Sequence, residues 1–114
     1  MKPAALRPQA KRDRQDEIRF YRIKASSQVA KNLVAASRLA LEQLQQNPGM
    51  GSPRIGQILD IPGLRGWGIS GFPLLWLYFE RADHLDVVRL LGERQDILSI
   101  LGDYPHAETR AALA

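Results

Sequence analysis

The spacing of the apolar residues changes from helical to strand-like at the Pro- and Gly-rich segment 47–53. Before this segment, apolar residues recur at helical spacing in two stretches, and after it they follow strand patterns. A helical pattern does not fit a strand, so the break predicts helices in the first half and a sheet in the second. We predict that segment 47–53 is a loop, and a long one if it continues to Asp60.

Two helices are predicted in the first half. The first begins near Pro8 and continues to Lys24, because Pro suits a first helical turn and 9–24 holds neither Gly nor Pro. Ser26-Ser27 ends it and offers an N-cap for a second helix of about 18 residues. The residues at helical spacing, expected to share the inner face, are Ala10, Arg14, Ile18, Tyr21 and Ala25 in the first helix and Val29, Leu33, Ala36, Ala40 and Leu44 in the second. Together they predict a helical hairpin, preceded by a short extended segment at 4–6.

Three strands are predicted in the second half, over 64–69, 72–79 and 85–91, with turns at 70–71 and 82–84. Alternation places Arg65, Trp67 and Ile69 on one face of the first strand, and Leu85, Val87, Arg89 and Leu91 on one face of the third. Asp96 is expected to cap a short C-terminal helix. The predicted fold is α+β, with the hairpin packed on a mostly antiparallel sheet of three or four strands. We expect one domain over 1–102 and a tail over 103–114.

Length and composition exclude several classes of protein. A chain of 114 residues holds one core and has no room for a two-domain enzyme. The absence of Cys excludes disulfides, thiolate zinc sites, iron–sulfur clusters and Cys nucleophiles. No apolar run approaches the roughly 18 residues of a membrane span, and the N-terminus lacks the apolar core of a secretory signal. We therefore expect a cytoplasmic protein with no membrane partner.

Positive charge is concentrated in the first half. Residues 1–60 hold 11 basic and 5 acidic side chains, whereas residues 61–114 hold 5 and 7. The excess fits either a solvated basic face of the helices or a surface for an acidic partner.

Catalytic signatures are sparse. The sequence has no G-x-S-x-G, no phosphate-binding Gly-rich loop and no paired His for a metal, so we predict neither metal nor cofactor. Asp13, Asp16 and Glu17 alternate with arginines, which favours surface ion pairs over an acid/base pair. These signatures leave the question of an enzyme uncertain, with little in the sequence to favour one.

Arg65 and Arg89 are unusual because they lie inside strand patterns, where an unpaired guanidinium is costly to bury. They either bridge to carboxylates at the ends of the sheet or form a basic, partly concave surface that binds phosphate or an acidic peptide.

Four segments in order resemble the ParE/RelE toxin superfamily, over roughly residues 4–102. They are 44–51 (LQQNPGMG), 63–69 (GLRGWGI), the aromatic strand 72–78, and 87–91 followed by Arg94-Gln95-Asp96-Ile97. The resemblance implies a helical hairpin on a curved antiparallel sheet. It also implies a toxin of a type II toxin–antitoxin module, of the kind associated with plasmid stabilisation, whose antitoxin wraps the toxin with its C-terminal part.

The target depends on the branch of the superfamily. RelE-like members cut mRNA on the ribosome, and Arg65 and Arg89 match two of their basic positions. The other positions differ, since Gly92 stands where many members have His, and no Lys follows Lys31. The ParE branch, which poisons DNA gyrase by binding, is therefore favoured; a RelE-like ribonuclease or an inactive partner-binding member is the alternative. The residues expected to bind the target or the antitoxin are Arg54, Arg65, Trp67, Arg89 and Arg94.

Overall fold

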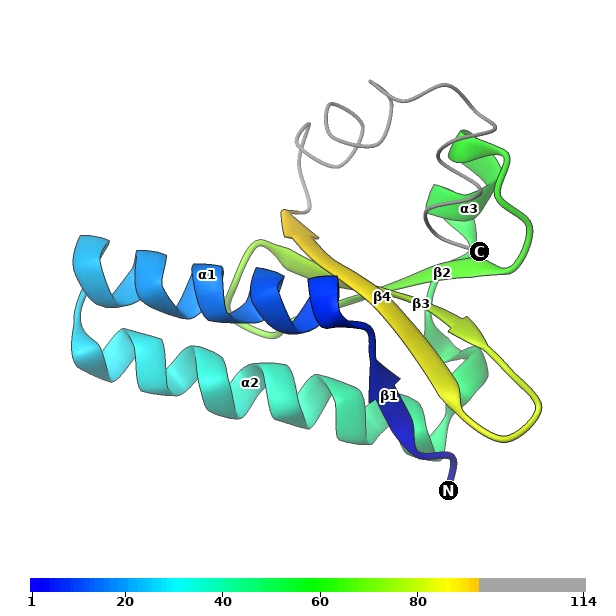
Figure 1. Cartoon of the computed structure of the whole chain (residues 1–114), viewed down its shortest axis with the longest axis horizontal. Coiled ribbons are helices and arrows are strands. Elements are labelled where there is room, and N and C mark those ends of the chain that lie inside the picture. Colours follow the sequence, from blue (N-terminus) through cyan, green and yellow to red (C-terminus); the bar gives the residue numbers. More distant parts are fainter. Residues whose placement is uncertain (93–114) are drawn as a thin grey trace.

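A computed structural model describes residues 1–92 as a helical layer packed on a four-stranded mixed sheet (Figure 1). The elements in chain order are β1 (Ala4–Leu6), α1 (Pro8–Lys24), α2 (Ser27–Gln46), the 3₁₀ turn η1 (Pro48–Met50), α3 (Arg54–Leu59), β2 (Leu64–Gly68), β3 (Leu74–Glu80) and β4 (Leu85–Gly92). The predicted α+β class is confirmed. The predicted C-terminal helix and tail lie outside the described residues.

The helical hairpin has the boundaries that its capping residues predict. Pro8 occupies the first turn of α1, and the Ser26 hydroxyl accepts a hydrogen bond from the backbone N–H of Val29 at the start of α2. Leu33 and Leu44 of α2 are fully buried, as predicted. On α1, however, the buried residues are Ala10 and Asp13, so Asp13 takes the place on the buried face that was predicted for Arg14.

The sheet has the strand order β1-β4-β3-β2, with β1 parallel to β4 and the other pairs antiparallel. Its hairpin-facing side carries Trp76, Tyr78, Leu85 and Val87, which pack in one cluster with Leu33 and the rest of the buried hairpin face. Trp76 also donates a hydrogen bond from its indole Nε1 to the backbone oxygen of Ser37. This cluster fixes the hairpin on the sheet.

The other side of the sheet carries a second apolar cluster, formed by Ile61, Leu64, Leu77, Phe79, Val88 and Leu91. An irregularity in the β3–β4 pairing lies between Leu77, which pairs with Arg89, and Tyr78, which pairs with Val87. Val88 is the extra residue, and it shifts the alternation of β4. The prediction that Leu85, Val87, Arg89 and Leu91 share a face is therefore wrong, because Val87 and Leu91 belong to opposite clusters.

Helix α3 is also a correction, because the predicted long loop ends at Pro53. The helix is short, and it packs against β2 with Ile55 and Leu59 against the second apolar cluster. Gly56 makes this packing possible: a Cβ there would stand 2.5 Å from the backbone oxygen of Leu64. Asp60 ends the helix in the left-handed conformation, with a φ of 55°.

Candidate functional site

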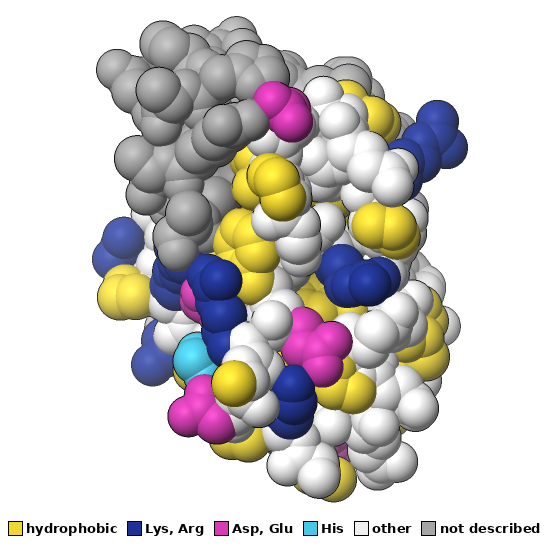
Figure 2. All heavy atoms as spheres, turned by 90° about the vertical axis from the view of Figure 1, so that its right-hand side faces the viewer, with side chains coloured by type: hydrophobic (Ala, Val, Ile, Leu, Met, Phe, Trp, Pro, Cys, Tyr) yellow, Lys and Arg dark blue, Asp and Glu magenta, His cyan; other side chains and the backbone are white. Residues whose placement is uncertain are grey.

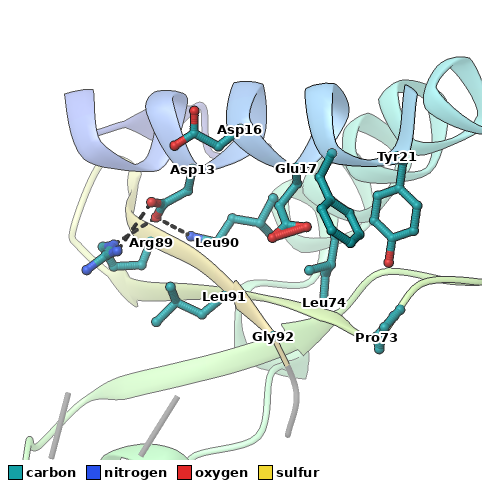
Figure 3. Close-up of a pocket in the computed structure, with 11 residues that line it drawn as sticks. Asp13, Asp16, Glu17, Tyr21, Pro73, Leu74, Arg89, Leu90, Leu91 and Gly92 are labelled. Atoms are coloured by element: carbon teal, nitrogen blue, oxygen red, sulfur yellow. Dashed lines mark hydrogen bonds and ion pairs between the residues drawn. The ribbon is translucent and has the colours of Figure 1, made fainter. Parts of the chain in front are cut away.

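Asp13 joins α1 to the edge of β4 (Figure 3). Its side chain accepts hydrogen bonds from Arg89 Nε at 2.7 Å and Nη2 at 3.2 Å, from the backbone N–H of Leu90 at 3.0 Å, and from the Gln9 amide at 2.9 Å. Strand β1 ends at Leu6, so it does not extend far enough along β4 to pair with Leu90. The Asp13 carboxylate satisfies the backbone N–H of Leu90. The two hydrogen bonds from Arg89 compensate for the burial of this carboxylate.

Arg89 is therefore held by a carboxylate of the chain itself. This arrangement matches the structural alternative for Arg89, a bridge to an acidic side chain. It corrects the expectation that Asp13 forms surface ion pairs with neighbouring arginines, since Asp13 is only 8% exposed. Asp16 does conform to that expectation, through an exposed pair with Arg19 at 3.9 Å.

A groove of about 550 Å³ opens beside this ion pair, between α1 and the ends of β3 and β4 (Figure 3). Its charged side chains are Asp13, Asp16, Glu17 and Arg89, and its apolar wall includes Phe20 and Leu74. Three carboxylates accompany one guanidinium, which makes the groove unfavourable for a phosphate group.

Arg65 on β2 holds the η1 turn in place through hydrogen bonds. Its Nη1 donates to the backbone oxygen of Gly51 at 2.7 Å and to that of Gly49 at 3.3 Å. Tyr78, its cross-strand neighbour, donates its hydroxyl to the Pro48 oxygen at 2.6 Å and accepts from the Gly51 N–H at 3.0 Å. Burial raises the pKa of Tyr78 above its ordinary value, which keeps the hydroxyl a donor.

The two sheet arginines do not form one basic surface. Arg65 pairs with Tyr78 and Arg89 pairs with Leu77, two successive residues of the intervening strand β3. Successive residues of a strand point to opposite faces, and Tyr78 and Leu77 lie in different apolar clusters. Each guanidinium is bonded to a different part of the chain.

The other predicted site residues are dispersed. Arg54 is the first residue of α3 and is exposed. Trp67 on β2 packs on the hairpin side of the sheet, and its indole donates to the Gln43 amide oxygen at 3.3 Å. Arg94 lies outside the described residues.

Trp67 lines a second groove, of about 520 Å³, that sequence reasoning did not predict. The other lining residues come from the end of α2 and the turn after it: Leu39, Glu42, Gln43, Gln46, Asn47 and Met50. Leu39 is 50% exposed and Met50 38% exposed, so the groove has apolar walls and a polar rim. Leu39 lies outside the buried stripe of α2, which is the signal that could have indicated this surface.

A cluster of alternating charges lies at the opposite end of the sheet from the hairpin tip. Asp86 accepts from Arg7 at 2.8 and 2.9 Å and from Arg81 at 2.9 Å, and Lys2 pairs with Glu80 at 2.8 Å. The hydrogen bonds from Arg7 hold the pKa of Asp86 below its usual value. Figure 2 shows this side of the molecule, where basic and acidic side chains alternate.

Residues 1–92 hold neither a group of metal ligands nor a membrane-spanning helix. In that range no three His, Asp or Glu side chains are grouped closely enough to hold a metal ion. No helix of this part is both long and apolar enough to cross a membrane.

Comparison with curated protein sequences finds no match. A solved structure described as the chromosomal ParDE TA system from P. aeruginosa matches with a TM-score of 0.68 and 19% identity, over 81% of this chain and 96% of that chain. This likeness concerns the fold. The family model of the ParE toxin of type II toxin–antitoxin system, parDE, matches residues 5–97. That match spans most of the sequence, and the chain therefore belongs to the ParE toxin family.

Proposed function

We propose that this chain is a toxin that inhibits DNA gyrase by binding and that a cognate antitoxin neutralises it. The observation that carries the choice of a binding mechanism is the position of the sheet arginines. Arg89 is bonded to Asp13, and Arg65 is bonded to the backbone of the η1 turn. Family membership supports the toxin role, and the internal bonds of these arginines support a toxin that binds its target.

The chemistry of RNA cleavage explains why these bonds matter. Attack by a 2′-hydroxyl needs a base, an acid and groups that stabilise the charge of the phosphorane. The two arginines were the candidates for the last task, yet they lie on different faces and already have partners. Binding to a protein target does not require a base, an acid and a charge-stabilising group in one site.

The test is a gyrase supercoiling assay with the purified full-length chain. We expect supercoiling to fall and cleaved plasmid to accumulate as the chain is added. A RelE-like ribonuclease would instead leave gyrase unaffected and arrest translation with cleaved mRNA. Normal growth on expression without an antitoxin would identify an inactive member.

Arg54 is the residue we propose for direct contact with gyrase. It is exposed at the start of α3, whereas Arg65 and Arg89 are bonded internally. Arg54→Ala should weaken inhibition without lowering the melting temperature. Arg38→Ala removes another exposed arginine, from α2, and serves as the matched control. Equal inhibition by the two variants would contradict the assignment of Arg54.

For the antitoxin we propose the groove beside Trp67. An amphipathic segment buries apolar side chains against Leu39 and Met50 and keeps its polar side facing Glu42 and solvent. Leu39→Glu should reduce both binding of the antitoxin and its rescue of growth. Ile58→Glu places the same charge on another exposed apolar position, on α3, and should leave binding unchanged. The place to look for the antitoxin is a short reading frame adjoining this one.

A further inference from the structure

The tip of the helical hairpin has an unusual charge pattern. Residues 18–41, which include the end of α1 and most of α2, contain five basic residues and no acidic residue. All five are exposed: Arg19, Arg22, Lys24, Lys31 and Arg38. Figure 1 shows that the end of the hairpin where α1 meets α2 projects beyond the sheet. The alternating charges at the other end of the molecule have no counterpart here.

Two apolar side chains are exposed among these cations. Phe20 is 51% exposed and Ile23 is 68% exposed. Ile23 follows Arg19 by four positions and Phe20 by three, so the apolar pair lies on the helix surface between Arg19 and Arg22 on one side and Lys24 on the other. We call Arg19, Phe20, Arg22, Ile23 and Lys24 the tip patch.

The ring of Phe20 is held by other aromatic rings. It packs edge-to-face on Tyr21 at a centroid distance of 5.3 Å, and Tyr21 packs edge-to-face on Phe72 at 5.2 Å. Phe72 in turn packs against the main apolar cluster. An exposed ring with this support is a fixed platform, so ordering it on binding costs little entropy.

Helix electrostatics explains part of the tip patch. Cations in the last turn of α1 interact favourably with the helix dipole, and a solvated basic face needs no partner. Neither effect accounts for a large aromatic and a large aliphatic side chain exposed between the cations. Phe20 also lines the acidic groove with Asp16 and Glu17, and Asp16 is 3.9 Å from Arg19, so Arg22 and Lys24 are the cations of the tip patch with no recorded acidic partner among residues 1–92.

We propose that the tip patch binds single-stranded nucleic acid, with phosphates on Arg19, Arg22 and Lys24 and a base stacked on Phe20. A polynucleotide strand alternates anions with flat apolar rings, and the tip patch offers cations beside an exposed ring. A duplex presents its phosphates but keeps its bases stacked, so it would leave Phe20 and Ile23 without a contact. This inference does not depend on gyrase as the target.

The test is fluorescence anisotropy of a labelled 20-nucleotide oligo(dT) with the purified full-length chain, in the absence of gyrase. We expect a dissociation constant of about 10⁻⁶–10⁻⁴ M that weakens with salt. Phe20→Leu keeps an apolar side chain and removes the ring, so it should weaken binding about five- to one-hundred-fold. A labelled duplex of the same length should bind less tightly.

A matched pair of variants tests the position of the charge. Arg22→Gln with Lys24→Gln should make the slope of log K against log salt shallower by about 1.4, since each phosphate contact contributes about 0.7 for a single strand. Lys11→Gln with Arg12→Gln removes the same charge from the other end of α1 and should leave the slope unchanged. The melting temperature of each variant checks that it is folded.

Any one of the following results would overturn the proposal. They are absence of oligo(dT) binding at low salt, binding insensitive to Phe20→Leu, equal slopes for the two double variants, and tighter binding of the duplex. Binding to anionic phospholipid vesicles but not to oligo(dT) would assign the tip patch to a membrane surface and also overturn it.

Discussion

The two ends of α1 differ in how they relate to the sheet. At the N-terminal end, Ala10 and Asp13 are buried, and Asp13 completes the hydrogen bonding of β4. At the C-terminal end, Phe20 and Ile23 are exposed on the projecting hairpin tip. The N-terminal end of α1 is therefore anchored, because its residues pack on and bond to the sheet. The C-terminal end is free, because its residues face solvent and are available to a partner. Substitutions at the anchored end should therefore lower the free energy of unfolding more than substitutions at the free end.

The largest effect is expected at Asp13. Asp13→Ala leaves the Arg89 guanidinium, whose side chain is 21% exposed, without its carboxylate and the Leu90 N–H without its acceptor. Removing one partner of such a pair should lower the free energy of unfolding by about 3–5 kcal/mol. Urea denaturation measures the loss.

Two further variants support this measurement. Asp13→Asn keeps one acceptor oxygen and should lose less stability, which keeps the test informative if the alanine variant does not fold. Asp16→Ala, on the exposed side of the same helix, should change stability by at most about 0.5 kcal/mol. Equal losses at Asp13 and Asp16 would show that the hydrogen bonds to β4 are not the anchor.

The second effect concerns packing at the same end. Ala10 is completely buried between the hairpin and the sheet. Ala10→Leu adds carbon atoms where there is no space, and overpacking should cost about 1–3 kcal/mol. Ala35→Leu makes the same addition at an exposed position of α2 and should be nearly neutral. If both variants unfold at the same urea concentration, α1 is not tightly packed at its anchored end.

A smaller effect on stability is expected at Asp86, and it should depend on pH in the acid range. Arg7, which precedes α1, holds the pKa of Asp86 below its usual value. A carboxyl with a lowered folded-state pKa stabilises the fold above its unfolded pKa of about 3.9, and that contribution disappears as the pH falls through the folded value. Asp86→Asn should therefore lose stability at neutral pH and show a flatter stability profile below about pH 4.

Asp83 gives the control for this titration. Its pKa is also lowered, by a hydrogen bond to His84, but its carboxyl is fully exposed and solvent screens the interaction. Asp83→Asn should leave the acid profile close to that of the unchanged chain. A profile flattened as much by Asp83→Asn as by Asp86→Asn would remove Asp86 as the cause.

The sequence predicted those features that rest on local patterns. Pro8, Ser26 and Asn47-Pro48 mark the ends of the two long helices, and the apolar runs mark the strands. Helix α3 was missed because it has only six residues, starts directly after Pro53 and contains Gly56, all of which are typical of a loop, whereas the close packing of Gly56 on Leu64 appears only in the fold. The faces of β4 were wrong because one extra residue, Val88, inverts the alternation, and a bulge leaves no mark in composition.

The hydrogen-bond partners of Arg65 and Arg89 could not be predicted either, because they depend on tertiary contacts. Asp13 and Arg89 are separated by 76 residues, and Asp13 looked like its neighbours Asp16 and Glu17. Arg65 bonds to carbonyl groups, which every residue possesses, so its partner has no sequence signature. The expected bridge to a carboxylate is present for Arg89, whereas Arg65 bonds to backbone oxygens instead, and only the fold identifies either partner.

The smallest effect is expected at the free end of α1, and Ile23→Ser tests it against Ile18→Ser in the same helix. Ile18 packs against the main cluster, so its loss should cost about 1–3 kcal/mol. Ile23 is 68% exposed, and its loss should stay within about 0.5 kcal/mol. Urea denaturation of the two variants gives the difference directly. A cost at Ile23 equal to that at Ile18 would mean that Ile23 is packed in solution, and the hairpin tip would then cease to be a free surface. A cost near zero, combined with weaker oligo(dT) binding, would assign Ile23 to binding rather than to folding.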